Sequence, residues 1–205
     1  MERNMKSIVV YCGSNLGTNK AYFDAAQNLG KVLAEQGCRL VYGGGNIGLM
    51  GTIASSVLEN GGEVIGVIPT FLKKKEGAHL RLNKLYETAN MTDRKNKMIE
   101  LAEGFIAMPG GLGTYEELFE VLSQAQLKLH PYPIGILNVA GFFDPLLQML
   151  QNTADAGFMP QQNMDLLCVA DDAENLLEQM RHWQPHDAVK WVLPEWAKAE
   201  KQTLS

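Results

Sequence analysis

The chain has 205 residues, of which 46% are hydrophobic and 20% are charged. This composition is typical of one globular domain and excludes a disordered or low-complexity protein. The 18 basic and 23 acidic residues give a net charge of −5, which argues against non-specific nucleic-acid binding, because that binding needs a basic surface.

Short apolar runs alternate with amphipathic stretches, which predicts strands separated by helices. In chain order we expect a strand at 7–12, a helix at 19–36, a strand at 39–42, a helix ending near 60, a strand at 63–68, a polar segment around 73–76, a strand at 84–88, a helix at 92–103, a strand at 105–108, a helix at 114–129, a strand at 134–138, a helix from 144, a strand at 166–170 and a helix at 172–183. Thr92 or Asp93 is the expected N-cap of the fourth helix.

Strands that are apolar throughout belong to a parallel sheet covered by helices on both faces. The sequence therefore predicts a doubly wound α/β fold. Residues 1–183 are expected to form a single nucleotide-binding domain, and 184–205 a C-terminal tail that packs on the body or on a partner.

The first residues, the apolar segments and the cysteines indicate the cellular location of the protein. The first residues lack a signal peptide, and no segment approaches the ~18 apolar residues of a membrane helix. Three scattered cysteines indicate reduced thiols, so we expect a cytoplasmic protein that contacts no membrane. The four histidines fit no zinc spacing, so no metal is expected. Cys12 is interpreted as a buried residue at a strand end.

Three of the expected strands end in glycine-bearing turns. Ligands of an open parallel sheet bind at the carboxyl ends of its strands, and glycine lets backbone N–H groups approach a ligand closely. A helix that begins after such a turn offers unpaired N–H groups that suit a phosphate. The alternative is that each turn is only a tight connection. The turns are Cys12-Gly13-Ser14, Tyr42-Gly43-Gly44-Gly45 and Pro109-Gly110-Gly111-Leu112-Gly113-Thr114.

The second turn matches the dinucleotide fingerprint GxGxxG at Gly43, Gly45 and Gly48. That fingerprint belongs to the first strand–helix turn of a nucleotide-binding unit, with an acidic residue closing the next strand. Here the match follows the second strand, and the next strand ends in Pro69 without an acid. We therefore interpret the match as accidental. The chain also lacks GxxxxGK[ST], which excludes a P-loop NTPase.

Two charged clusters lie at the starts of expected helices. Glu117 lies on the edge of the buried face of its helix, whereas Glu116 points about 100° away, so the two cannot act as a pair. Alternatively, both acids only complement the helix dipole. Arg94 and Lys95 place cations where the dipole disfavours them, which indicates a phosphate or carboxylate partner. The alternative is a solvated face with Asp93 as counter-charge.

These residues resemble the Lonely Guy (LOG) family of nucleoside 5′-monophosphate phosphoribohydrolases. The signature PGGxGTxxE is complete from Pro109 to Glu117, and the resemblance extends from about Ser7 to Met180. It includes CGSN, VYGGGNIGLMG, GEVIGVIP, the Arg94-Lys95 pair and GILNVAGFFDPLL. Members are often labelled lysine decarboxylases, but this chain shows no evident cofactor lysine site.

The resemblance implies a Rossmann-like enzyme that hydrolyses the N-glycosidic bond of AMP or of N6-prenylated AMP, the latter giving active cytokinin. The products would be a free base and ribose 5-phosphate. It implies a homodimer or larger oligomer and no cofactor. Glu117 and Arg94 would form the catalytic pair. The substrate-binding residues would be Ser14, Gly44, Gly45, Glu76, Met91, Lys95, Gly110, Gly111, Gly113, Thr114, Glu116 and Ser123.

The chain departs from the family pattern at three places. Thr92 stands where the family often has His, and Gln124 where it often has Trp. Lys74-Lys75 replaces the common Pro-Arg before Glu76. The preferred base therefore stays open. So do two other interpretations: a non-catalytic nucleotide sensor or carrier of the same fold, and a nicotinamide-dependent oxidoreductase, which Pro69 and the misplaced fingerprint disfavour.

Overall fold

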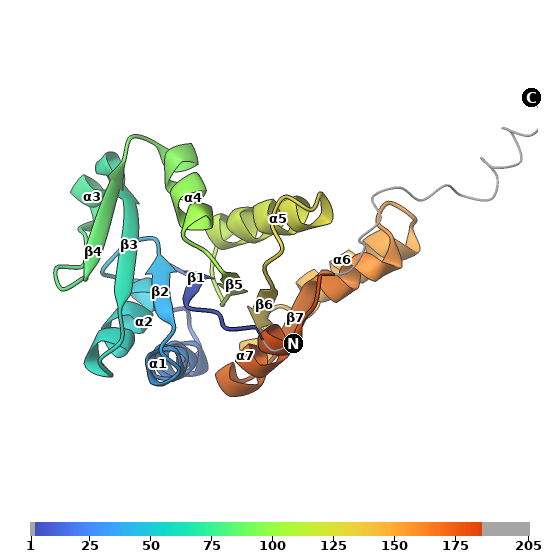
Figure 1. The fold of residues 1–205 in the computed structure, drawn as a ribbon, viewed down its shortest axis with the longest axis horizontal. Coiled ribbons are helices and arrows are strands. Elements are labelled where there is room, and N and C mark those ends of the chain that lie inside the picture. The colour runs from blue at the N-terminus through green and yellow to red at the C-terminus, as the bar shows by residue number, and fades with distance from the viewer. Residues whose placement is uncertain (1–2, 186–205) are drawn as a thin grey trace, which may run out of the picture.

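The structure, a computed structural model, describes residues 3–185 and alternates strands with helices (Figure 1). The strands are β1 (Ser7–Tyr11), β2 (Arg39–Tyr42), β3 (Val64–Pro69), β4 (Lys84–Thr88), β5 (Gly104–Ala107), β6 (Ile134–Leu137) and β7 (Leu167–Ala170). The α-helices are α1 (Lys20–Glu35), α2 (Gly48–Glu59), α3 (Thr70–Glu76), α4 (Met91–Glu100), α5 (Leu112–Gln126), α6 (Asp144–Asp155) and α7 (Ala173–His182), and the 3-10 helices are η1 (Val139–Gly141) and η2 (Gln161–Leu166).

The strands form one sheet in the order β4-β3-β2-β1-β5-β6-β7. Every neighbouring pair is parallel, which confirms the predicted α/β fold. Helices α1, α2 and α7 cover one face of the sheet, and α4, α5 and α6 contribute to the core on the other (Figure 1).

Alternate residues of one strand enter the two cores, because successive side chains of a strand point to opposite faces. In β1, Ile8 and Val10 belong to the core beside α1 and α2, whereas Val9 and Tyr11 belong to the core beside α4 and α5. All five residues of β1 are buried. The continuous apolar run in the sequence is therefore the mark of a strand covered on both sides.

The strand order reverses direction at β1. The chain builds outward from β1 through β2 and β3 to β4, then returns to place β5 against the other side of β1. Such a switch point leaves a crevice at the carboxyl ends of the two central strands. The turns after β1 and β5 meet there, and the Gly13 N–H donates to the Pro109 carbonyl over 3.0 Å.

Some elements differ from their prediction. The polar segment around 73–76 is the C-terminal part of helix α3. Helix α4 begins at Met91 with Asn90 as N-cap, whose side chain accepts from the Asp93 N–H over 2.8 Å. The expectation of Thr92 or Asp93 as N-cap was wrong, because the Asn90 side-chain oxygen already satisfies a first-turn N–H.

None of the helices in residues 3–185 is long and apolar enough to cross a membrane. The predicted tail at 184–205 lies outside the described residues from 186 onward.

Candidate active site at the switch point

A cavity of about 240 Å³ opens at the carboxyl ends of the central strands. Its walls come from the turns after β1, β2 and β5, from α2, from the end of β3 and the start of α3, and from the N-terminal parts of α4 and α5. It is lined by Cys12, Gly13, Ser14, Gly43, Met50, Ile68, Leu72, Met91, Arg94, Gly111, Leu112, Gly113, Thr114, Glu116 and Glu117.

Arg94 and Glu117 face each other in this cavity. The Arg94 Nη1 lies 3.7 Å from the Glu117 Oε1, and each residue is only 8% exposed. The Arg94 Nε donates to the Val67 carbonyl of β3 over 3.1 Å, which fixes the direction of the guanidinium. Two residues 23 positions apart in sequence therefore form one buried ion pair, so the interpretation of Arg94 as a solvated surface charge was wrong.

Gly43 makes room for the guanidinium. A Cβ at this position would lie 1.9 Å from the Arg94 Nη2 and 3.0 Å from the Met50 Sδ. No side chain fits there unless Arg94 moves. The glycine after β2 thus allows the close approach of the Arg94 guanidinium.

Glu117 titrates near neutrality. Burial raises the pKa of its carboxyl to about 7, although the Arg94 charge lowers it. The desolvation of the carboxylate outweighs the ion pair because the 3.7 Å separation gives only part of the attraction of a close contact. Burial also raises the pKa of the Cys12 thiol, so this residue stays protonated and is not a nucleophile at neutral pH.

Lys95 has its partners on α5. Its ammonium is bonded to the Glu116 carboxylate and lies 3.2 Å from the Glu120 Oε2. These contacts raise the pKa of Lys95, chiefly through the hydrogen bond to Glu116. The partner expected for this cation is therefore a pair of carboxylates on α5, and the pair ties the starts of α4 and α5 together.

The turn after β5 presents the N-terminus of α5 to the cavity. Gly111 is the N-cap and makes no side-chain cap bond, and the first N–H groups of a helix have no intrahelical acceptor. Added Cβ atoms at Gly111 and Gly113 would meet nothing within 4 Å, so both backbones border open space. Gly110 differs, because its Cβ would lie 2.1 Å from the Thr114 Oγ1. This end of the cavity can take an anion.

The structure brings most of the predicted substrate-binding residues together. Gly110 lines an adjoining cavity of about 280 Å³ that shares Gly13, Ser14 and Gly111 with the first. The predicted residues that line the Arg94–Glu117 cavity itself are Ser14, Met91, Gly111, Gly113, Thr114 and Glu116.

Other predicted residues lie elsewhere. The Gly44 carbonyl accepts from the His79 N–H over 3.1 Å, and Gly45 forms a bridge with Ala78. These two glycines contact the segment before β4 and do not line the Arg94–Glu117 cavity, so their part in substrate binding stays a prediction.

Lys95 also lies outside the lining. Ser123 lines a different cavity, because it lies about two turns beyond Glu116 and so away from the start of α5. Ser123 thus does not line the Arg94–Glu117 cavity, and its part in substrate binding stays a prediction. Glu76 ends α3, and its side chain lies outside what the structure describes.

Sequence reasoning missed several lining residues. Gly43 was recognised in the glycine run but not as a neighbour of Arg94. Met50 lies in the first turn of α2, at the same edge of the sheet as the glycine turns. A signal existed for Met50, since the start of every helix that follows a parallel strand lies at the ligand-binding edge.

Comparison with known proteins identifies relatives of the whole domain. A family model described as "Possible lysine decarboxylase" matches residues 50–180. None of the described residues that line the cavity is a lysine, so the cavity offers no amine for a Schiff base.

The cytokinin riboside 5′-monophosphate phosphoribohydrolase LOG of Oryza sativa subsp. japonica is 42% identical over 91% of this chain and 77% of its own length. The cytokinin riboside 5′-monophosphate phosphoribohydrolase LOG1 of Arabidopsis thaliana is 40% identical to this protein over 92% of this chain and 89% of its own length. Among solved structures, the molybdenum cofactor carrier protein of Chlamydomonas reinhardtii superposes with a TM-score of 0.66 at 22% identity, covering 88% of this chain and 98% of that one. This last likeness concerns the fold alone. With its sheet, its PGGLGT turn and two such relatives at about 40% identity, the chain belongs to the LOG family of phosphoribohydrolases.

Proposed function

We propose that the protein hydrolyses the N-glycosidic bond of an adenine nucleoside 5′-monophosphate, AMP or N6-prenylated AMP. The products are the free base and ribose 5-phosphate. The observation that carries the proposal is the buried Arg94–Glu117 pair beside the N-terminus of α5 in one cavity. The names of the rice and Arabidopsis relatives support the same reaction.

The cavity offers separate places for the phosphate and for the reacting ribose. The unpaired N–H groups of the first turn of α5 suit the 5′-phosphate. Glu117 lies one turn further along the same helix, so a bound phosphate places the ribose next to its carboxylate. Binding of the remote phosphate then supplies energy for positioning the reacting carbon.

Glu117 acts on the anomeric carbon. Departure of the base leaves positive charge on the ribosyl group, which a neighbouring carboxylate stabilises. The same carboxylate can accept a proton from the attacking water, whose oxygen forms the new bond to the anomeric carbon. The base leaves with the electron pair of the broken bond and takes up a proton. General acid–base catalysis of this kind typically increases the rate by roughly 10²–10⁴-fold.

Arg94 favours the ionised form of Glu117, because its positive charge lowers the pKa of Glu117 against the effect of burial. Its planar group also has donors left for a ribose hydroxyl or a phosphate oxygen.

The decisive experiment is incubation of the protein with AMP and with N6-prenylated AMP, followed by chromatography for free base. We expect base release from at least one of them. Glu117→Gln should lose on the order of 10²–10⁴-fold in turnover and keep nucleotide affinity. Glu120→Gln is the matched control, because Glu120 lies on the same helix outside the cavity lining, and it should keep most of the turnover.

Nucleotide binding without release of any base would contradict the proposal. That result would favour the alternative of a non-catalytic nucleotide sensor or carrier of the same fold. A cytoplasmic homodimer or larger oligomer remains part of the proposal. The oligomer rests on the family resemblance, and the cytoplasmic location rests on the cysteine pattern. Light scattering in solution measures the mass of the assembly.

A further inference from the structure

The Arg94–Glu117 cavity has a polar side and an apolar side. Apart from Arg94, its polar side chains come from α5 and from the turn after β1, and they are Ser14, Thr114, Glu116 and Glu117. Apart from Arg94, the walls from α2, β3, α3 and α4 are apolar, and they are Met50, Ile68, Leu72 and Met91. In the proposed reaction the polar side holds the phosphate and the ribose, so the apolar side is left for the base.

Two thioethers lie beside the Arg94 guanidinium. The Met91 Sδ is 3.9 Å from the Arg94 Nη1. Near the other terminal nitrogen, a Cβ added to Gly43 would lie 1.9 Å from the Arg94 Nη2 and 3.0 Å from the Met50 Sδ, so both atoms border the same small space. A Cβ added to Gly45 would lie 3.2 Å from the Met50 Cε. The Met50 side chain is therefore packed against the turn after β2, close to Arg94.

Three of the four apolar residues offer surface to a ligand. Met50 and Leu72 are half-buried, and Met91 is 36% exposed, whereas Ile68 is only 1% exposed. Thioether sulfur makes favourable contacts with aromatic rings, and the unbranched methionine side chain adapts to rings of different outline. These walls therefore suit an aromatic base.

We propose that Met50, Leu72 and Met91 hold the purine base by apolar contact and do not distinguish the groups at its 6-position. A thioether is only a weak hydrogen-bond acceptor, and leucine has no polar group. These side chains therefore neither select a 6-amino donor nor reject a 6-oxo acceptor. The substrate class is then purine nucleoside 5′-monophosphates, of adenine and hypoxanthine alike. The inference rests on the proposed function, because that function places the phosphate at the start of α5.

The degree of discrimination separates such a pocket from one that hydrogen-bonds the base. A hydrophobic pocket rejects a polar isostere by only about 100-fold, whereas a site built to hydrogen-bond a substrate group rejects the analogue without it by roughly 10⁴–10⁵-fold. We expect the dissociation constants of AMP and of inosine 5′-monophosphate (IMP) to differ by less than about 100-fold. Calorimetric titration of Glu117→Gln measures both constants, because this variant is expected to bind nucleotides without cleaving them.

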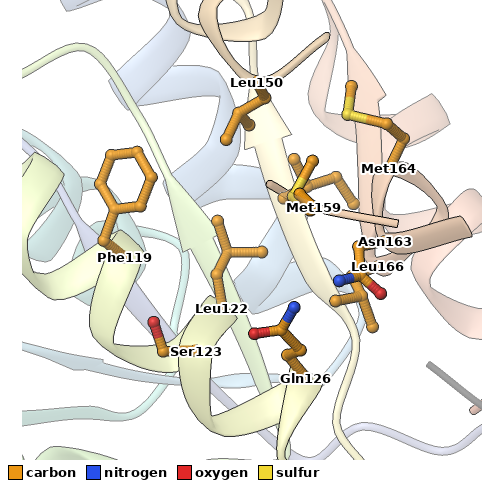
Figure 2. Close-up of a pocket in the computed structure, with 10 residues that line it drawn as sticks. Phe119, Leu122, Ser123, Gln126, Leu150, Met159, Asn163, Met164 and Leu166 are labelled. Carbon is orange, nitrogen blue, oxygen red and sulfur yellow. The ribbon is translucent and has the colours of Figure 1, made fainter. Parts of the chain in front are cut away.

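Methionine methyl groups locate the bound base. The ring current of a purine shifts the resonances of methyl groups that it contacts. NMR of Glu117→Gln with labelled methionine methyl groups should show saturable shifts of Met50 and Met91 with AMP and with IMP. Ribose 5-phosphate, which has no base, should give much smaller shifts. Met159 and Met164 are internal controls, because they line a second cavity (Figure 2) that shares no lining residue with the first.

Met50→Ala and Leu72→Ala, each made in the Glu117→Gln background, test the walls outside α4. Each should weaken the binding of AMP and of IMP by a similar factor, up to about tenfold for the thioether and about tenfold or more for leucine. Neither should change the affinity for ribose 5-phosphate. Met50→Leu conserves volume and should keep most of the affinity. Phe71→Ala is the matched control for Leu72→Ala, because Phe71 is on α3, 52% exposed and outside the cavity lining.

Three outcomes would overturn the inference. One is a preference between AMP and IMP greater than about 100-fold. Another is the absence of shifts at Met50 and Met91 that depend on the base. The third is an equal loss of affinity for ribose 5-phosphate and for AMP in the alanine variants, which would make the role of these side chains structural. Failure of the wild-type protein to release base contradicts the proposed function but leaves these binding measurements intact, so the two proposals fail separately.

Discussion

Glu117 and Arg94 show at the scale of single residues how burial competes with charge. An ion pair with a separation of 3.7 Å would lower the pKa of an exposed glutamate. In this cavity the loss of water dominates, and the pKa of Glu117 is raised to about 7. A carboxyl that changes protonation state near neutral pH inside a cleft is typical of functional sites.

The rate should therefore depend on the protonation of Glu117. The proposed role requires the carboxylate, which predominates above the pKa and is lost below it. We expect log kcat/KM to rise with unit slope up to about pH 7 and then to level off. Stopped base-release assays from pH 5 to 9 measure this profile.

Two variants should shift that profile in opposite directions. Arg94 lowers the pKa of Glu117, whereas Glu120 raises it. The residual activity of Arg94→Ala should therefore level off at a higher pH, and that of Glu120→Gln at a lower pH. A rate that falls as pH rises through 7 would instead make Glu117 a proton donor and contradict the proposed role.

Gly43 should act on the rate through Arg94. In Gly43→Ala the new Cβ displaces the guanidinium, since it would lie 1.9 Å from the Arg94 Nη2. A misplacement of about 1 Å in a catalytic group can cost on the order of 100-fold in kcat. A double-mutant cycle checks the mechanism: Gly43→Ala should cost little more in an Arg94→Ala background. Equal losses in both backgrounds would mean that Gly43 has another role.

At the scale of elements, the site depends on how the starts of helices meet. Lys95 joins α4 to Glu116 and Glu120 of α5, and the Met50 N–H of α2 donates to the Gly13 carbonyl over 3.3 Å. The apparent fingerprint glycine Gly48 belongs to this packing. Its φ is +64°, and an added Cβ would lie 2.2 Å from the Ser14 carbonyl carbon. This glycine thus permits close packing of α2 on the turn after β1.

Gly48→Ala should destabilise the fold by at least about 2 kcal/mol, because strain at positive φ adds to a clash with backbone. Urea unfolding followed by circular dichroism measures the change. Gly61→Ala is the matched control, since its φ is +78° but its Cβ would meet nothing within 4 Å. The control should show only the cost of the backbone conformation. Similar losses in both variants would show that the close approach to Ser14 is unimportant.

At the scale of the whole molecule, the central strands that end at the candidate site are more buried than the edge strand β4. β1 and β5 are buried throughout and lie in the middle of the sheet. β4 is an edge strand whose residues are exposed or half-buried. The floor of the cavity is thus formed at the ends of buried central strands, while the segment from α3 to β4 forms a less buried border.

Native-state hydrogen exchange should follow this gradient. We expect the amides of β1 and β5 to exchange only through global unfolding, and those of α3 and the free side of β4 through smaller openings. Mass spectrometry of peptides from the exchanged protein measures the protection. Equal protection of β4 and β1 would contradict the gradient.

The sequence by itself determined the alternation of strands and helices, the parallel sheet and the edge of the sheet at which the Arg94–Glu117 cavity opens. These follow from local periodicity and from glycines at strand ends, which are properties of short segments. The ion pair of Arg94 with Glu117, the carboxylate partners of Lys95, the place of Ser123 and the two thioethers beside Arg94 were decided only by the tertiary structure. The physical reason is that the strand order β2-β1-β5 selects which turns and helix starts become neighbours, and no short segment contains that information.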